Sequence, residues 1–321
     1  MELWEKALKK DFRAIGKILR LIDDEDPEGL LMLEKLARYG GHAEIVGVTG
    51  SPGAGKSTLI DAWLKLLREE GKTVAVICVD PSSPFSGGAV LGDRLRMQRH
   101  ATDEGVFIRS VATRGQLGGL SSSVASMIEV LDAASFDRII IETVGVGQDE
   151  VDVVRVAQCV VLVLAPLQGD EVQAHKAGVL EIADIIVVNK ADAQGAEKTF
   201  KEITSAIELA NSRQKKPKVL KTVATEGTGI DRLEKETKAL LAEIKKNRLD
   251  MERERLQGLV IDFASKRFRE TALALLETDP EVKRLFNSAI NRDASFLEVS
   301  RLILQKTMTL SDVAHSKHEE R

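Results

Sequence analysis

The sequence predicts a doubly wound α/β fold with a mostly parallel sheet and helical extensions at both ends. Between residues 41 and 246, short apolar runs alternate with longer amphipathic segments, which is the pattern of strand–helix–strand units. Most of these runs are apolar at consecutive positions, as expected for strands that are buried on both faces. A glycine-rich turn lies between the first run and the first amphipathic segment. Residues 41–246 are therefore predicted to form one α/β domain.

Seven segments of this domain are predicted to be strands. They are short and rich in Val, Ile and Leu, and helix-like segments separate most of them. The predicted strands span residues 44–50, 73–80, 106–112, 137–145, 159–166, 184–190 and 218–224.

The N-terminal extension, residues 1–40, is predicted to be helical. Apolar residues recur there at spacings of three to five from Leu3 to Ile22, and a second stripe follows at Leu30. Asp26 and Pro27 form a break and the start of a second helix. Two glycines at 40 and 41 end the extension.

The C-terminal segment, residues 247–321, contains no strand pattern. Residues 247–277 form one long, charged helical pattern, and the segments near 280–290 and 295–306 are also helical by periodicity. One interpretation is a set of helices packed back on their own domain. We favour a homodimerisation arm, because the segment is long, charged and outside the sheet.

Composition excludes several functional classes. The net charge is −4 and the isoelectric point is near 5.9, which gives no basic surface for nucleic acid and no general attraction to anionic membranes. The longest apolar runs are too short to cross a bilayer. We expect no secretory signal, because the first thirty residues contain no apolar h-region. Cys78 and Cys159 lie in apolar runs and are predicted to be buried thiols. We expect a cytoplasmic protein without a zinc site.

The segment from Gly50 to Ser57, GSPGAGKS, matches the phosphate-binding loop of P-loop NTPases at every fixed position. A predicted strand precedes it and a helix follows it, so that backbone N–H groups and the helix N-terminus face the phosphates. Lys56 is predicted to reach the β- and γ-phosphates, and the Ser57 hydroxyl to bind Mg²⁺. The predicted phosphate-binding residues are Gly50, Ser51, Pro52, Gly53, Ala54, Gly55, Lys56, Ser57 and Thr58.

A guanine-reading motif directly follows DIIVV, residues 184–188 of the sixth predicted strand. Asn189, Lys190 and Asp192 form the pattern N-K-x-D. The Asp192 carboxylate can accept hydrogen bonds from N1–H and the 2-amino group of guanine, whereas adenine would leave it unpaired. Asn189 and Lys190 are expected to brace the loop and cover the base. The residues Ala224, Thr225 and Glu226, which follow the last predicted strand, are further candidates for the base pocket.

Acidic residues at strand ends are candidates for the Mg²⁺ site. Glu142 ends the fourth predicted strand, and the Gly145 N–H could sense the γ-phosphate. Asp80 ends the second strand, and Asp93 follows in a loop rich in Pro, Ser and Gly. Asp93 could also be the N-cap of the next helix.

The predicted reaction is hydrolysis of GTP to GDP and phosphate, which depends mainly on positioning and charge neutralisation. Lys56, Asp80, Asp93 and Glu142 are the predicted catalytic residues. Asp80, Asp93 or Gln148 could orient the attacking water. No arginine finger is identifiable, although Arg114 lies in a glycine-rich loop. Slow intrinsic turnover, raised by a partner, is therefore expected.

The chain resembles the MeaB/ArgK family of methylmalonyl-CoA mutase-associated GTPases, which belong to the SIMIBI class. The strings that carry the resemblance are GSPGAGKST, VDPSSPFSGGAVLGDRLRM, ATRGQLGGLSS, ETVGVGQDEVDV, APLQGDEVQAHKAG and NKAD, which fall between residues 40 and 230. The VATEG stretch departs from the Ser-Ala-like stretch of many relatives.

The resemblance implies a homodimer that gates delivery of adenosylcobalamin to an acyl-CoA mutase and protects and reactivates that enzyme. The cofactor belongs to the partner. Residues 80–93, 142–148 and 168–176 would be three switches, the last with His175. A metallochaperone-type GTPase, a transport-associated kinase and a nucleotide-dependent scaffold with negligible hydrolysis are the alternatives.

Overall fold

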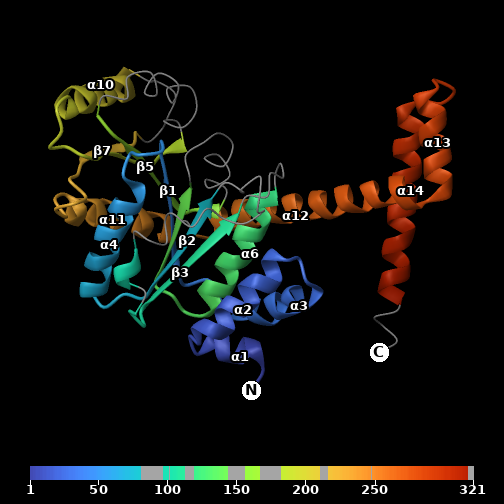
Figure 1. The fold of residues 1–321 in the computed structure, drawn as a ribbon, viewed down its shortest axis with the longest axis horizontal. Coiled ribbons are helices and arrows are strands. Elements are labelled where there is room, and N and C mark those ends of the chain that lie inside the picture. The colour runs from blue at the N-terminus through green and yellow to red at the C-terminus, as the bar shows by residue number, and fades with distance from the viewer. Residues whose placement is uncertain are drawn as a thin grey trace. The chain divides into compact units, whose positions relative to one another are not determined.

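The computed structural model describes residues 1–80, 97–100, 102–112, 119–143, 156–166, 182–209, 216–246 and 248–316 (Figure 1). These residues divide into two compact units, Met1–Leu256 and Gln257–Arg321. The first unit contains the sheet and the N-terminal helices, and the second contains helices alone.

The described part of the first unit forms a seven-stranded sheet with the order β3-β2-β4-β1-β5-β6-β7. Every neighbouring pair is parallel, so the predicted α/β class is confirmed. All seven predicted strands are present, most of them shorter than the apolar runs suggested. Their bounds are β1 (Glu44–Thr49), β2 (Val74–Asp80), β3 (Val106–Ala112), β4 (Arg138–Thr143), β5 (Cys159–Leu164), β6 (Ile185–Val188) and β7 (Lys218–Lys221).

Helices cover both faces of this sheet (Figure 1). On one face α4 (Lys56–Glu69) and α11 (Ile230–Lys246) pack through Trp63 and Leu233 against residues of the central strands. The helices α6 (Gly119–Ala133) and α10 (Ala196–Leu209) lie on the other face, where Ile203 packs against β5 and β6. The five inner strands of the sheet are thus buried on both sides, which explains why they are apolar at consecutive positions. Cys78 and Cys159 are free and buried, as predicted.

The N-terminal extension forms α1 (Leu3–Leu8), α2 (Phe12–Asp23), α3 (Pro27–Leu36) and a short 3₁₀ helix (Ala37–Tyr39). The break at Asp26 is confirmed, because its side chain caps α3. A second break, between α1 and α2, was missed. There Lys10 has a φ of 58° and Asp11 accepts hydrogen bonds from the N–H groups of Arg13 and Ala14. The apolar stripe of α2 packs against α6 and β3 in the same compact unit.

A buried charged cluster joins the amino ends of β1 and β4 to two helices. Arg138, which is fully buried, donates to Glu44 at 2.6 Å and to Glu234 of α11 at 3.1 Å. Trp63 of α4 donates its indole N–H to the same Glu234 at 2.7 Å, and Lys72 lies 3.2 Å from Glu44. The cluster is paired throughout, which is the condition for tolerating charges in a protein interior.

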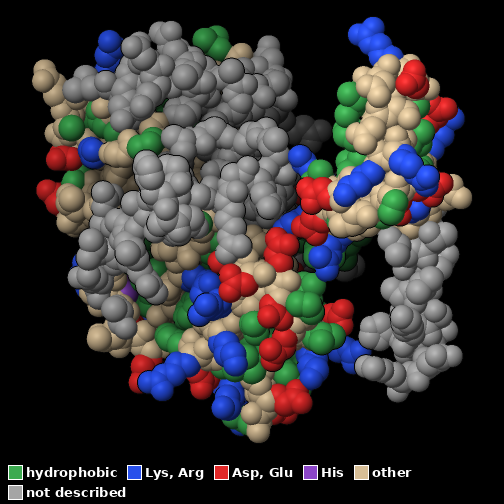
Figure 2. All heavy atoms as spheres, turned by 45° about the vertical axis from the view of Figure 1, so that its right-hand side comes forward, with side chains coloured by type: hydrophobic (Ala, Val, Ile, Leu, Met, Phe, Trp, Pro, Cys, Tyr) green, Lys and Arg blue, Asp and Glu red, His purple; other side chains and the backbone are tan. Residues whose placement is uncertain are grey.

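The second unit is a small helical assembly. It contains the end of α12 (Arg248–Thr278), together with α13 (Pro280–Ile290) and α14 (Phe296–Ser316). The helix α14 continues ten residues beyond the predicted end at 306, because no Gly or Pro interrupts it. Leu275, Val282, Val299 and Ile303 form its core. Hydrophobic side chains also lie on the surface of these helices (Figure 2). Within the described ranges, no helix combines the length and apolarity that crossing a membrane requires.

The ionisation of Glu44 makes the stability of the fold depend on pH in the acid range. Burial alone would raise the pKa of Glu44, but the neighbouring Arg138 and Lys72 outweigh it and lower the pKa from 4.5 to about 2. The stabilisation by ionised Glu44 is therefore present above about pH 4.5 and lost as the pH falls toward 2. We expect Glu44→Gln to lower the free energy of unfolding at pH 7 by about 1–2 kcal/mol, since solvent screens part of the interaction.

Urea titrations at pH 7, 4 and 3 check this expectation. The difference between Glu44→Gln and the wild type should shrink steadily below pH 4.5. Glu208→Gln, at an exposed position of α10, is the control and should stay close to the wild type throughout. A difference for Glu44→Gln that is independent of pH would contradict the assignment.

Candidate nucleotide site

The segments that bear the predicted motifs meet at the carboxyl edge of the sheet. The phosphate loop connects the end of β1 to the start of α4, and the base-reading loop follows β6. The strand β4, which ends with Glu142 and Thr143, lies directly beside β1. Because all the strands are parallel, their carboxyl ends share one edge, where open α/β sheets bind their ligands.

Two glycines of the phosphate loop are required by its geometry. Gly50 has a φ of +138°, and a Cβ there would collide with the carbonyl oxygen of Val163 in β5. Gly55 has a φ of +93°, and a Cβ there would collide with the amide nitrogen of Asn189. The loop is therefore packed tightly against β5 on one side and the base-reading loop on the other.

Lys56 lies across the phosphate loop, at the N-terminus of α4. It is buried, and its Nζ donates to the carbonyl oxygens of Gly50 at 2.6 Å and Ser51 at 3.2 Å. These contacts hold the ammonium group beside the backbone that the sequence assigns to the phosphates. The arrangement places a positive charge and the N-terminus of a helix at one point, which is how proteins bind phosphate groups.

Two of the residues that were predicted to bind Mg²⁺ are in direct contact. The Ser57 hydroxyl donates to Oε1 of Glu142 at 2.7 Å, and both side chains are buried. The other carboxylate oxygen, Oε2, lies 4.0 Å from the thiol sulfur of Cys78 in β2. Asp80 ends β2 at the same edge of the sheet. Hydroxyl and carboxylate oxygens are the ligands that Mg²⁺ prefers, so these residues fit that ion.

Asn189 joins the base-reading loop to the phosphate loop. Its Nδ2 donates to the carbonyl oxygen of Ala54 at 3.0 Å. Its Oδ1 accepts from the Thr222 hydroxyl at 3.0 Å and from the Ala224 N–H at 3.2 Å. One buried amide thus connects the segments after β1, β6 and β7. Thr222 was not predicted from the sequence, although it lies two residues before the predicted residue Ala224.

The neighbouring residues complete this loop. Lys190 has a φ of +55°, and its Nζ donates to the carbonyl oxygen of Gly53 at 2.8 Å. The next N–H, of Ala191, donates to the carbonyl oxygen of Thr222 at 3.0 Å. Asp192 is exposed, as are Thr225 and Glu226. The carboxylate of Asp192 is therefore accessible to a ligand.

Several predicted residues lie outside the described part of the chain. They belong to the loops that the sequence assigns to the switches and to catalysis, and the side chain of Asp80 is likewise not described. The residues concerned are Asp93, Arg114, Gly145, Gln148 and His175.

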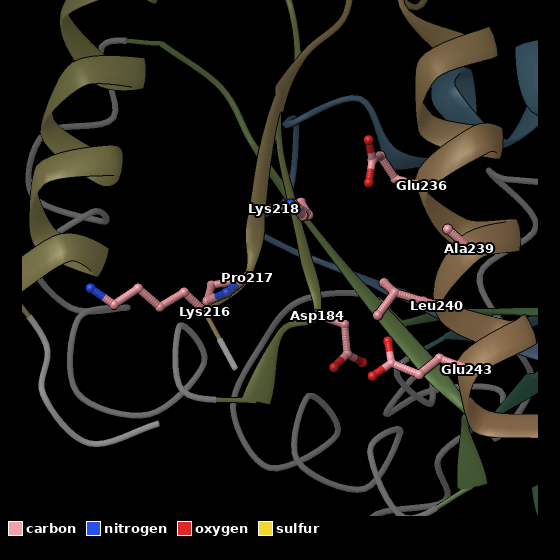
Figure 3. A pocket seen from close by; sticks show the side chains of 8 residues that line it. All are labelled: Asp184, Lys216, Pro217, Lys218, Glu236, Ala239, Leu240 and Glu243. Carbon is pink, nitrogen blue, oxygen red and sulfur yellow. The ribbon is translucent and has the colours of Figure 1, made fainter. Parts of the chain in front are cut away.

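A separate cavity of about 280 Å³ lies at the opposite edge of the sheet (Figure 3). It is bounded by Asp184 before β6, by Lys216 and Lys218 at β7, and by Glu243 on α11. Because Asp184 and Lys218 stand at the amino ends of their strands, the length of the sheet separates this cavity from the phosphate loop. It is not part of the candidate nucleotide site.

A parallel sheet with a phosphate loop after one strand and an N-K-x-D loop after another defines a P-loop GTPase. The model of the family described as "Methylmalonyl Co-A mutase-associated GTPase MeaB" matches residues 15–274. The chain belongs to this family.

Individual relatives agree with that assignment. A protein of Pyrococcus horikoshii named "Putative GTPase" is 44% identical over 318 residues, covering 95% of this chain and 97% of the relative. The GTPase ArgK of Escherichia coli is 39% identical over 240 residues, covering 71% and 72% of the two chains. A crystal structure titled "LAO/AO transport system kinase" is similar with a TM-score of 0.69 and 26% identity, covering 95% of this chain and 96% of that one.

These findings establish the activity. The chain is a GTPase, which binds GTP and hydrolyses it to GDP and phosphate.

Gly55 offers a test of the contact between the two loops. In Gly55→Ala, the new Cβ must displace the Asn189 amide and break its bond to Ala54. We expect the affinity for GDP and for GTP to fall by roughly tenfold or more, as the loss of hydrogen bonds in a buried site implies. Isothermal titration calorimetry measures this.

Gly71→Ala is the matched control. Gly71 has a similar φ of +79°, but a Cβ there would meet nothing within 4 Å. It should therefore share the backbone strain, about 1–2 kcal/mol, without changing nucleotide affinity. Equal affinities for Gly55→Ala and Gly71→Ala would show that the contact with Asn189 is irrelevant to binding.

Proposed function

We propose that this GTPase is a chaperone for an adenosylcobalamin-dependent acyl-CoA mutase, specifically methylmalonyl-CoA mutase. Its nucleotide state would gate cofactor loading and the protection and reactivation of the mutase. The observation that carries the proposal is the match to a mutase-associated GTPase family over residues 15–274. The adenosylcobalamin would be held by the mutase and not by this chain.

The proposed roles at the phosphates follow from the contacts around α4. Lys56 would exchange the loop carbonyls for the β- and γ-phosphate oxygens, because an anionic ligand is a better partner for an ammonium group than a neutral carbonyl. Gly50 to Thr58 would supply backbone N–H groups. Ser57 and Glu142, with Asp80 and Asp93, would hold Mg²⁺, which when bound neutralises phosphate charge.

The proposed basis of guanine selectivity is the exposed carboxylate of Asp192. It would accept from N1–H and the 2-amino group of guanine, while Lys190 covers the base and Ala224, Thr225 and Glu226 border it. Asn189 would position this loop and not read the base, because its amide is already bonded to Ala54, Thr222 and Ala224. Residues 80–93, 142–148 and 168–176 would respond to the nucleotide as switches.

The mutase partner is tested by affinity capture from extract of the source cells. The immobilised wild-type protein is loaded with GDP or with a non-hydrolysable GTP analogue, and captured proteins are identified by mass spectrometry. We expect an acyl-CoA mutase, in an amount that depends on the nucleotide.

Lys56→Ala should abolish the nucleotide dependence of this capture while its circular dichroism stays that of the wild type. Lys65→Ala, an exposed position on the same helix, is the matched control and should behave as the wild type. Capture only of transport or metalloenzyme components would overturn the proposal.

We also propose that residues 247–321 form a homodimerisation arm. Large apolar side chains of α12 are exposed, among them Leu256, Val260 and Phe263 at 54%, 59% and 42%. Their spacing of four and three places them on one face of the helix. An exposed apolar stripe of this kind is typical of a helix that packs against a partner.

The exposed apolar stripe of α12 predicts that negative charges introduced there prevent dimerisation. The double variant Val260→Asp and Phe263→Asp should be monomeric by size-exclusion chromatography with light scattering at concentrations where the wild type is a dimer. Leu31→Asp, which changes an equally exposed residue of α3 (58%), should leave the mass unchanged. A monomeric wild type, or a dimeric double variant, would refute the arm.

A further inference from the structure

Two buried threonines connect the phosphate loop to the strand that carries Glu142. Thr49 is the last residue of β1 and directly precedes Gly50, and Thr143 is the last residue of β4 and directly follows Glu142. The Thr143 hydroxyl donates to the Thr49 hydroxyl oxygen at 2.9 Å. Thr143 is 1% exposed and Thr49 is 0% exposed.

The strand register explains why these side chains meet. The strands β1 and β4 are parallel neighbours in which Val48 pairs with Glu142, so the next residues, Thr49 and Thr143, are also level. Successive side chains of a strand point to opposite faces. Glu142 faces α4, where Ser57 holds it, and the Thr143 hydroxyl therefore holds the same strand end from the other face.

A pair of hydroxyl groups is unusual among the apolar side chains of this sheet. The strands around it consist mainly of Val, Ile and Leu, as in CVVLVL of β5. Valine has nearly the shape of threonine, and burying a hydroxyl without a partner costs free energy that burying a methyl group does not. Two hydroxyl groups that hydrogen-bond to each other fix the direction and the distance of the contact, whereas two valine side chains would not.

We propose that Thr143 is a positioning residue for GTP hydrolysis, acting through its hydrogen bond to Thr49. The bond fixes the end of β4 relative to the first residue of the phosphate loop. It thereby fixes the position of Glu142, the predicted Mg²⁺ ligand that Ser57 contacts. The α- and β-phosphates are bound by the loop itself. The hydroxyl pair therefore affects the hydrolytic step and not the binding of GDP.

The test compares Thr143→Val with Thr143→Ser in the full-length protein. Thr143→Val keeps the shape and removes the donor, while Thr143→Ser keeps the donor. We expect kcat of Thr143→Val to fall roughly tenfold, the change that one neutral hydrogen bond produces in a rate constant. The Kd for GDP should stay within about twofold of the wild type, and Thr143→Ser should recover most of kcat.

The double variant Thr49→Val and Thr143→Val separates positioning from simple stabilisation. Replacing both partners leaves no hydroxyl unpaired, so its Tm should return toward that of the wild type. Its kcat should remain low, because the directional contact is absent. If a single valine substitution prevents folding, kcat and Tm of this double variant still test the proposal.

Three results would overturn the proposal. The first is an unchanged kcat in Thr143→Val. The second is a double variant whose kcat recovers together with its Tm, which would make the pair structural. The third is an equal loss of affinity for GTP and GDP, which would place the effect in nucleotide binding. None of these results bears on the mutase partner, since only GTP hydrolysis is measured.

Discussion

The hydrogen bonds of the Asn189 side chain are the interaction on which the nucleotide site depends. Its amide has one donor bond to Ala54 and two acceptor bonds, from Thr222 and Ala224. Ala54 follows β1, Thr222 and Ala224 follow β7, and Asn189 itself follows β6, so this side chain links the segments after three strands. A buried amide with such partners has one favourable orientation. We therefore expect the phosphate loop and the base-reading loop to move as one unit, so that binding the phosphates also positions the base.

The amino ends and the carboxyl ends of the strands differ in what they carry. The amino edge carries the cluster of Arg138, Glu44 and Glu234, which ties β1 and β4 to the helices α4 and α11. The carboxyl edge carries the candidate nucleotide-binding loops. The five inner strands between them are buried on both faces, and such a close-packed interior deforms little. The charged cluster at the amino ends of the strands thus helps to fix the positions of the loops at their carboxyl ends. The same two strands and the same two helices connect the two ends.

Local patterns predicted most of the fold, and topology decided the rest. The seven strands and the phosphate loop were predictable because each is a short pattern with its own physical cause. The bond from Asn189 to Ala54 spans 135 residues and that from Thr143 to Thr49 spans 94. Both exist because the sheet order places β4 on one side of β1 and β5 followed by β6 on the other, an order that hydrophobic periodicity does not contain. The break at Lys10 was missed because the apolar stripe continues through it, and only the φ of 58° and the cap by Asp11 reveal it.

The most direct measurement compares ligands with and without a base. Competition calorimetry would give the affinity for GTP and for inorganic triphosphate, with magnesium present, in the wild type, Asn189→Ala and Asp192→Asn. If Asn189 joins the two loops, Asn189→Ala weakens both ligands by roughly tenfold, the effect of losing hydrogen bonds that hold a binding loop. Asp192→Asn then weakens GTP alone. If Asn189→Ala leaves the affinity for inorganic triphosphate unchanged, the two loops are independent and the account is wrong.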